Sequence, residues 1–145
     1  METVKERGGR PLMIKLIVGL KGTGKTKTLI TETNAAMAAD RGCVVCVEKG
    51  RKLIYDISHK VRLISSDEYD INTYDRFFGF LCGLMSANYD ITDIFVDSIT
   101  KICGDDLNAL EAFLAEVSQV IRNINITITL SKDPGELTDE LKKYL

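Results

Sequence analysis

Eight consecutive residues near the start of the chain combine three glycines with a lysine and a hydroxyl group. They are Gly19-Leu20-Lys21-Gly22-Thr23-Gly24-Lys25-Thr26, which match the pattern GxxxxGK[ST] at every defined position. Glycines let successive backbone N–H groups turn toward one anion, and Lys25 supplies a positive charge for the β- and γ-phosphates. The Thr26 hydroxyl is a hard oxygen ligand of the kind that Mg²⁺ prefers. The run therefore predicts a site for a nucleoside triphosphate, ATP or GTP, bound together with Mg²⁺.

Other residues stand where they could extend this site. Lys21 within the run and Lys27 just after it are candidate phosphate contacts, with exposure to solvent as the alternative. Asp97 follows the apolar run Ile94-Phe95-Val96. An Asp at the carboxyl end of a buried strand often supplies the second oxygen ligand of Mg²⁺, so Asp97 is the metal candidate, with a helix or turn cap as the alternative. Ser98 comes next, so no glutamate stands directly beside this Asp.

The phosphate pattern needs a buried strand before it and a helix after it, and both are predicted. Leu12 to Val18 is almost continuously apolar, which indicates a central parallel strand, and a helix is expected from about Gly24 to Ala39. Later apolar runs continue the alternation. The further predicted elements are strands over 43–48, 91–97 and 124–130, a β-hairpin of 53–57 with 61–65, helices from 72 and over 106–122, and a short terminal helix after Asp133-Pro-Gly-Glu136.

Strands that alternate with helices predict an α/β fold, a three-layer sandwich with a mostly parallel sheet and right-handed crossovers. The β-hairpin is expected as an insertion in that fold. We expect one domain over residues 12–145, because the chain is long enough to bury a hydrophobic core of its own. Residues 1–11 are mostly polar and charged, which predicts a flexible leader.

Composition and charge exclude several classes of protein. The net charge of −2 gives no general attraction to nucleic acid, which is therefore not an expected partner, and no apolar run is long enough to span a membrane. Four cysteines without a signal sequence predict a reducing, cytoplasmic location. Cys43 and Cys46 are three positions apart and face opposite sides of a strand, which favours packing over a zinc or redox pair.

The strand, the loop from Gly19 to Thr26 and the following helix resemble the P-loop NTPase superfamily, on its RecA-like side. The resemblance covers about residues 12–131 and implies that superfamily's fold, with ATP and Mg²⁺ as ligands. It also implies a catalytic glutamate at the end of the strand that follows the phosphate-loop helix; Glu48 stands there, with an ordinary surface glutamate as the alternative. Thr129 or Ser131, at the end of the last core strand, would sense the γ-phosphate, unless Ser131 only satisfies a loop backbone group.

Three functions are compatible with these residues. The first is a slow ATPase or nucleotide-dependent switch, with Lys25 and Glu48 as catalytic residues. The second is a kinase for small molecules of nucleoside type, whose lid would be the segment 50–70 with Arg51 and Arg62. The third is a non-catalytic module that binds a protein partner in a nucleotide-dependent way. A homo-oligomer is also possible, because many relatives place a neighbouring subunit's arginine in the site.

The whole chain also resembles a group of short bacterial ATP-binding proteins that are labelled after the twitching-motility ATPase. The longer motility enzymes carry further acidic and histidine boxes, and this sequence lacks them. His59, its one histidine, stands between Ser58 and Lys60 in the expected hairpin tip, with no nucleophile beside it in the pattern.

Overall fold

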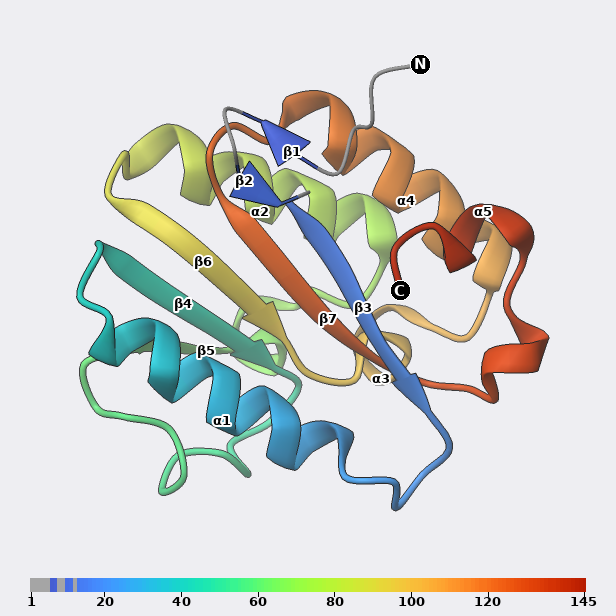
Figure 1. Cartoon of the computed structure of the whole chain (residues 1–145), viewed down its shortest axis with the longest axis horizontal. Coiled ribbons are helices and arrows are strands. Elements are labelled where there is room, and N and C mark those ends of the chain that lie inside the picture. The colour runs from blue at the N-terminus through green and yellow to red at the C-terminus, as the bar shows by residue number, and fades with distance from the viewer. Residues whose placement is uncertain (1–5, 8–9, 12) are drawn as a thin grey trace.

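Five parallel strands form the central sheet, in the spatial order β3-β7-β6-β4-β5 (Figure 1). The computed structural model describes residues 6–7, 10–11 and 13–145. The strands are β3 (Ile14–Gly19), β4 (Cys43–Glu48), β5 (Arg62–Ser65), β6 (Ile91–Val96) and β7 (Asn125–Ser131). Each neighbouring pair is parallel, so all five strands end at the same edge of the sheet.

Helices cover both faces of this sheet, which confirms the predicted three-layer sandwich (Figure 1). One face carries α1 (Lys25–Ala38), and the other carries α2 (Tyr74–Ala87) and α4 (Leu107–Val120). The larger core lies under α2 and α4, and the smaller core lies under α1. Buried members of the larger core include Phe77, Phe113, Leu114 and Ile128; those of the smaller core include Leu29, Cys46 and Phe95. None of the helices in the described residues is long and apolar enough to cross a membrane.

The two faces of the sheet differ in polarity, and β7 illustrates the difference. Ile126 and Ile128 belong to the larger core. Because side chains alternate along a strand, Thr127 and Thr129 lie on the α1 face instead. Both threonines are buried on that face, Thr129 completely.

The cysteines of the CxxC pattern lie on opposite faces of β4. Cys46 is buried in the smaller core, whereas Cys43 packs against the larger one. Both are free thiols. This arrangement agrees with the predicted packing role.

The predicted β-hairpin is wrong. Residues 51–60 contain no strand, and β5 pairs in parallel with β4 at the edge of the sheet. Leu53, Ile57 and Val61 are all buried in the smaller core. Their spacing of four residues is that of a turning chain with one apolar side, whereas a hairpin strand would need a spacing of two. Asn34 of α1 fastens the segment through two hydrogen bonds with its backbone. A 3-10 helix, η1 (Ser66–Tyr69), follows β5.

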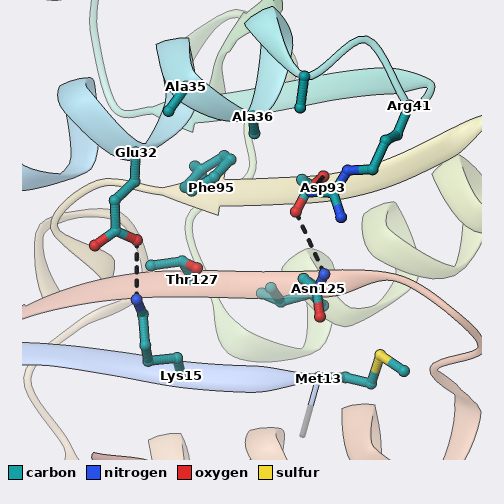
Figure 2. A pocket seen from close by; sticks show the side chains of 12 residues that line it. Met13, Lys15, Glu32, Ala35, Ala36, Arg41, Asp93, Phe95, Asn125 and Thr127 are labelled. Carbon is teal, nitrogen blue, oxygen red and sulfur yellow. Dashed lines mark hydrogen bonds and ion pairs between the residues drawn. The ribbon is translucent and has the colours of Figure 1, made fainter. Parts of the chain in front are cut away.

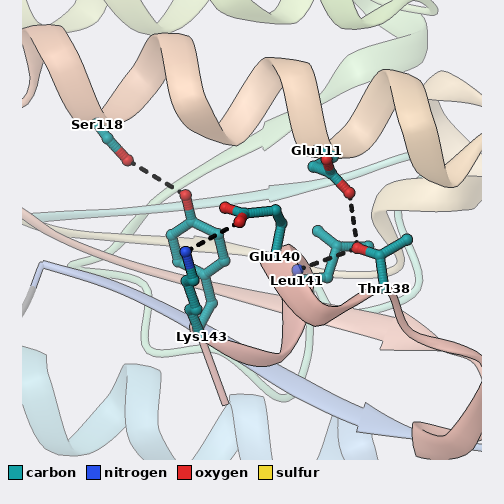
Figure 3. Close-up of polar contacts among 7 residues, drawn as sticks. Glu111, Ser118, Thr138, Glu140, Leu141 and Lys143 are labelled. Atoms are coloured by element: carbon teal, nitrogen blue, oxygen red, sulfur yellow. Dashed lines mark hydrogen bonds and ion pairs between the residues drawn. The ribbon is translucent and has the colours of Figure 1, made fainter.

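The end of the chain packs against α4 and the edge strand β3. Its elements are η2 (Pro134–Glu136), which begins with a capping box at Asp133, and α5 (Asp139–Lys142). Thr138 Oγ1 donates a hydrogen bond to Glu111 Oε2 of α4 at 2.6 Å (Figure 3). The backbone N–H of Leu16 in β3 donates to the Tyr144 carbonyl at 2.8 Å. The terminal segment therefore satisfies a donor on the exposed edge of the sheet.

Most of the predicted leader lies outside the described residues. The parts of residues 1–11 that the structure describes are two short strands, β1 (Glu6–Arg7) and β2 (Arg10–Pro11). They pair with each other in an antiparallel arrangement.

Candidate functional site

Helix α1 begins directly after the glycine-rich loop, at the carboxyl end of β3, and its first turn has no side-chain cap. Gly24 occupies the position before the helix, and the first turn contains no acidic residue. The first N–H groups of a helix have no partner within the helix, and together with the helix dipole they attract an anion. The local structure is thus the strand, loop and helix that the phosphate-binding pattern requires.

The backbone of the loop favours glycine at each of its three glycine positions. A Cβ atom on Gly19 would lie 2.5 Å from Thr23 Oγ1, so a larger residue would require the Thr23 side chain to move, and Gly22 has φ +85°. Gly24 has φ +86°, which residues with a side chain rarely adopt. A Cβ atom on Gly24, or on Gly22, would meet nothing within 4 Å. The loop is therefore closely packed at its base and open above the two glycines that precede the helix.

Lys25 lies over the loop, and the two flanking lysines do not. Lys25 Nζ donates to the Leu20 carbonyl at 2.9 Å, and its residue is only 9% exposed. Thr23 donates to the same carbonyl through Oγ1 at 2.7 Å. Lys21 and Lys27 are exposed. The charge at the loop therefore comes mainly from Lys25, since a charge in solvent is strongly screened.

Thr26 and Asp97 meet where α1 begins and β6 ends. Thr26 Oγ1 donates to Asp97 Oδ1 at 3.1 Å. Thr129 Oγ1, which is fully buried, donates to the same oxygen at 3.0 Å and accepts from the Ser98 N–H at 2.7 Å. One carboxylate oxygen thus joins α1, β6 and β7. The oxygen donors that this contact brings together are of the type that Mg²⁺ binds.

The register of the sheet explains why Thr129, and not Ser131, contacts Asp97. Val96 of β6 lies opposite Ile128 of β7, so the next residues along each strand, Asp97 and Thr129, are adjacent. Ser131 lies one pleat further on, opposite Gly19 at the base of the loop, and is half-buried. The sequence indicates a polar end for this strand, but which hydroxyl reaches the acid depends on register.

Glu48 ends β4, and its residue is only 4% exposed, so the alternative of an ordinary surface glutamate is wrong. Its Oε1 accepts from the Lys52 N–H at 2.9 Å and its Oε2 from the Leu53 N–H at 3.0 Å. Burial raises the pKa of Glu48 above its ordinary value; the two amide hydrogen bonds oppose that shift, and the charge of Asp97 adds to it. A carboxylate with these neighbours can hold the 48–53 turn and can also accept a proton.

Two cavities border these residues at the carboxyl edge of the sheet. The first, of about 250 Å³, is lined by Glu48, Lys49, Gly50, Lys52, Asp67, Asp97, Ser98 and Lys101. The second, of about 410 Å³, is lined by the loop, the end of β3 and the Asp133-Pro134 turn. Lys101 belongs to α3 (Ile99–Cys103), a five-residue helix that is too short to leave a periodic signal in the sequence.

The cavity in Figure 2, also of about 410 Å³, lies toward the opposite end of the sheet, between α1 and the first half of β3, β6 and β7. None of the sequence-predicted site residues lines it. There Lys15 Nζ pairs with Glu32 Oε1 at 2.9 Å, and Asp93 Oδ1 lies 3.5 Å from Asn125 Nδ2 (Figure 2). The charged side chains of this cavity pair with one another, Lys15 with Glu32 and Arg41 with Asp93. The cavity is separate from the predicted site because the two share no lining residue.

Comparison with known proteins agrees with the architecture. No family model matches the chain, and no curated protein matches its sequence. Among solved structures the chain is similar to the flagellar accessory protein FlaH from Methanocaldococcus jannaschii, with a TM-score of 0.51 and 18% identity, over 94% of this chain and 68% of FlaH. At this identity the likeness concerns the fold alone. Together with the parallel five-stranded sheet, it supports the α/β fold with a parallel sheet that the sequence predicts.

Proposed function

We propose that this protein binds a nucleoside triphosphate, most simply ATP, with Mg²⁺ and hydrolyses it slowly as a nucleotide-dependent switch. The observation that carries the proposal is the hydrogen bond between Thr26 and Asp97 beside the uncapped start of α1. It brings the two oxygen ligands that the motif predicts within reach of one cation, next to backbone donors suited to phosphate. Two sequence signals 71 residues apart converge on one point.

The small number of protein oxygens at this point suits Mg²⁺. Among the described residues, no group of three or more His, Cys, Asp or Glu side chains could enclose a metal. Mg²⁺ usually takes one or two protein oxygens and completes its shell with phosphate and water. Thr26 and Asp97 would hold the ion, and Thr129 would orient the carboxylate. When bound, Mg²⁺ would offset the negative charge of the β- and γ-phosphates.

Glu48 is the proposed general base. It would take a proton from the water whose oxygen attacks the γ-phosphorus, while the bond from that phosphorus to the β–γ bridging oxygen breaks and ADP leaves. Its raised pKa favours proton uptake, because a stronger base is a better acceptor. Its hydrogen bonds to Lys52 and Leu53 hold the carboxylate in a fixed direction. A loss of turnover without a loss of binding is the expected signature of Glu48→Gln.

The cavities at the carboxyl edge differ in size. Pockets for drug-sized ligands measure roughly 300–1,000 Å³. The 410 Å³ cavity beside the loop lies in that range and would suit the nucleoside part of ATP, whereas the cavity beside Glu48 and Asp97 is smaller, at about 250 Å³. Of the two arginines in the segment considered as a kinase lid, Arg51 pairs with Glu68 at 2.7 Å on the surface and Arg62 begins β5.

Calorimetry and phosphate release test the proposal. Purified protein with ATP and Mg²⁺ should give a saturable binding heat and slow release of phosphate. Lys25→Ala should weaken binding by more than about tenfold, because it removes a charged donor to phosphate. Lys27→Ala, a change of the same type at an exposed lysine two positions away, should bind nearly as wild type. An absence of binding heat in wild type would reject the proposal, and binding without release would leave a non-catalytic module. Release only with an added acceptor would indicate a kinase.

A further inference from the structure

The cavity beside Glu48 and Asp97 is also lined by positively charged side chains that do not belong to the sequence motifs. Three lysines line it together with the acidic residues: Lys49, Lys52 and Lys101. They come from the end of β4, the turn after it and α3. Asp97 forms the boundary between this cavity and the uncapped start of α1, through its hydrogen bond to Thr26. A γ-phosphate held at the loop would therefore have these lysines on its far side.

Two of the three lysines are already engaged with acidic groups. Lys49 Nζ pairs with Asp67 Oδ1 at 2.9 Å. The charge of Lys52 acts on Glu48, whose pKa it lowers, and its backbone N–H also binds that carboxylate. Lys101 has no ion pair and no side-chain hydrogen bond within the described residues. A ligand could engage its ammonium group without breaking an existing contact. Lys52, whose side chain also makes no ion pair or hydrogen bond among the described residues, instead acts on Glu48 through its charge.

The short helix α3 places Lys101 beside the acid. Ser98, which directly follows Asp97, has φ 58° and turns the chain sharply into the helix, and its N–H is bound by Thr129. Ile99 and Ile102 are buried in the larger core and anchor α3. Lys101 itself is exposed. Its position is thus set by two buried anchors and one hydrogen bond, while its long side chain keeps its freedom to reach an anion.

We propose that Lys101 contacts the γ-phosphate from within the same chain and stabilises the charge that it carries during hydrolysis. This inference rests on the proposed function, and it adds a catalytic residue to that site. Lys101 forms no covalent bond, so its contribution is electrostatic. The consequence is that the site needs no arginine from a neighbouring copy, and turnover per molecule is independent of protein concentration.

The test compares Lys101→Ala and Lys101→Arg with wild type and with Lys60→Ala, an exposed lysine outside the cavity. Phosphate release at saturating ATP should fall about 100- to 1,000-fold in Lys101→Ala, the range found for loss of one oxyanion-hole donor. Lys101→Arg should recover part of the lost rate of phosphate release. ADP binding, measured by calorimetry, should stay within about twofold of wild type, because ADP lacks the γ-phosphate. Binding of ADP with aluminium fluoride, which mimics the transferring phosphoryl group, should weaken most in Lys101→Ala, less in Lys101→Arg and not in Lys60→Ala.

Several outcomes would overturn the inference. Wild-type release from Lys101→Ala, with unaltered ADP–aluminium fluoride binding, would show that Lys101 does not contact the phosphoryl group. A turnover per molecule that rises over a roughly hundredfold range of wild-type concentration would indicate a cation from a second copy instead. ATP binding without hydrolysis in wild type would remove the reaction that Lys101 serves and leave nucleotide binding intact. Absence of ATP binding in wild type would reject the proposed function itself.

Discussion

Helices α1 and α4 have the same length, fourteen residues, but their N-termini are satisfied in opposite ways. Asp106 caps α4, and its Oδ1 accepts hydrogen bonds from the N–H groups of Asn108 at 2.9 Å and Ala109 at 3.2 Å. Helix α1 begins after Gly24, which has no side chain to offer. The same kind of backbone donor is therefore satisfied by a side chain in α4 and has no side-chain acceptor in α1.

The presence of a side-chain cap on α4 and its absence on α1 distinguish the helix end that is built for stability. A side-chain cap contributes about 1 kcal/mol to the stability of a helix. At α1 the chain forgoes that contribution next to Lys25 and to the contact between Thr26 and Asp97, as the proposed phosphate site requires. At α4 the side chain of Asp106 satisfies the first N–H groups, which points to a structural role. Substitutions at the two ends should therefore affect different measurements.

Giving α1 an acidic residue at the equivalent position should have the largest effect. In Gly24→Asp a carboxylate would stand where the phosphate is expected, so we predict ATP binding at least about 100-fold weaker by calorimetry. Gly24→Ala is the matched control, because it brings the same strain at φ +86° without the charge. Equal losses of affinity in the two variants would attribute the effect to strain and contradict this prediction.

The next effect concerns the hydroxyl that holds Asp97. Thr129→Val keeps the shape of the side chain but removes the hydrogen bond to Asp97 Oδ1. We expect the Mg²⁺ concentration needed for half-maximal ATP binding to rise about tenfold, as for other residues that orient a metal ligand. Thr127→Val, one pleat earlier on the same face of β7, should leave the Mg²⁺ dependence unchanged. A similar shift in both variants would mean that Thr129 acts only through general packing.

At α4 the expected effect is on stability alone. Asp106→Ala should lower the free energy of unfolding by about 1 kcal/mol, since two N–H groups lose their acceptor. ATP affinity should not change. Urea unfolding and calorimetry on the same sample measure both quantities, with Asn108→Ala as a control in the same turn. Weaker ATP binding in Asp106→Ala would show that the two helix ends are not independent.

The smallest effect is a pH dependence at Glu48. Its pKa is raised from the ordinary value of 4.5 in the folded state, so the folded protein holds this proton more readily than the unfolded chain. The stability that the group contributes is present below the unfolded pKa and is lost as pH rises through the folded pKa. The free energy of unfolding of wild type, minus that of Glu48→Gln, should therefore decrease from about pH 4 to pH 7 in urea titrations. Glu116→Gln, at an exposed position on α4, is the control, and a difference for Glu48 that is constant with pH would contradict the raised pKa.

Much of the fold could be predicted because its signals are local. The apolar run that became β3, the helical periodicity of α4 and the capping box at Asp133 each depend on neighbouring residues, and each formed where expected. The prediction of a hairpin failed because the buried apolar residues between 53 and 61 recur at a spacing of four and lie on one side of the chain. That side packs into the smaller core under α1, and a core forms from segments of the whole chain.

The sequence by itself determined the glycine-rich loop and the type of each site residue, since the loop's backbone needs glycine at fixed positions and phosphate and metal need particular donors. Only the tertiary structure decided which of these residues meet. Strand register selected Thr129 over Ser131 as the partner of Asp97, burial turned Glu48 into the anchor of the next turn, and the crossover into α3 brought Lys101 to the same cavity. The physical reason is that residue type sets what a group can bind, whereas the packing of distant segments sets where it lies and which groups it can reach.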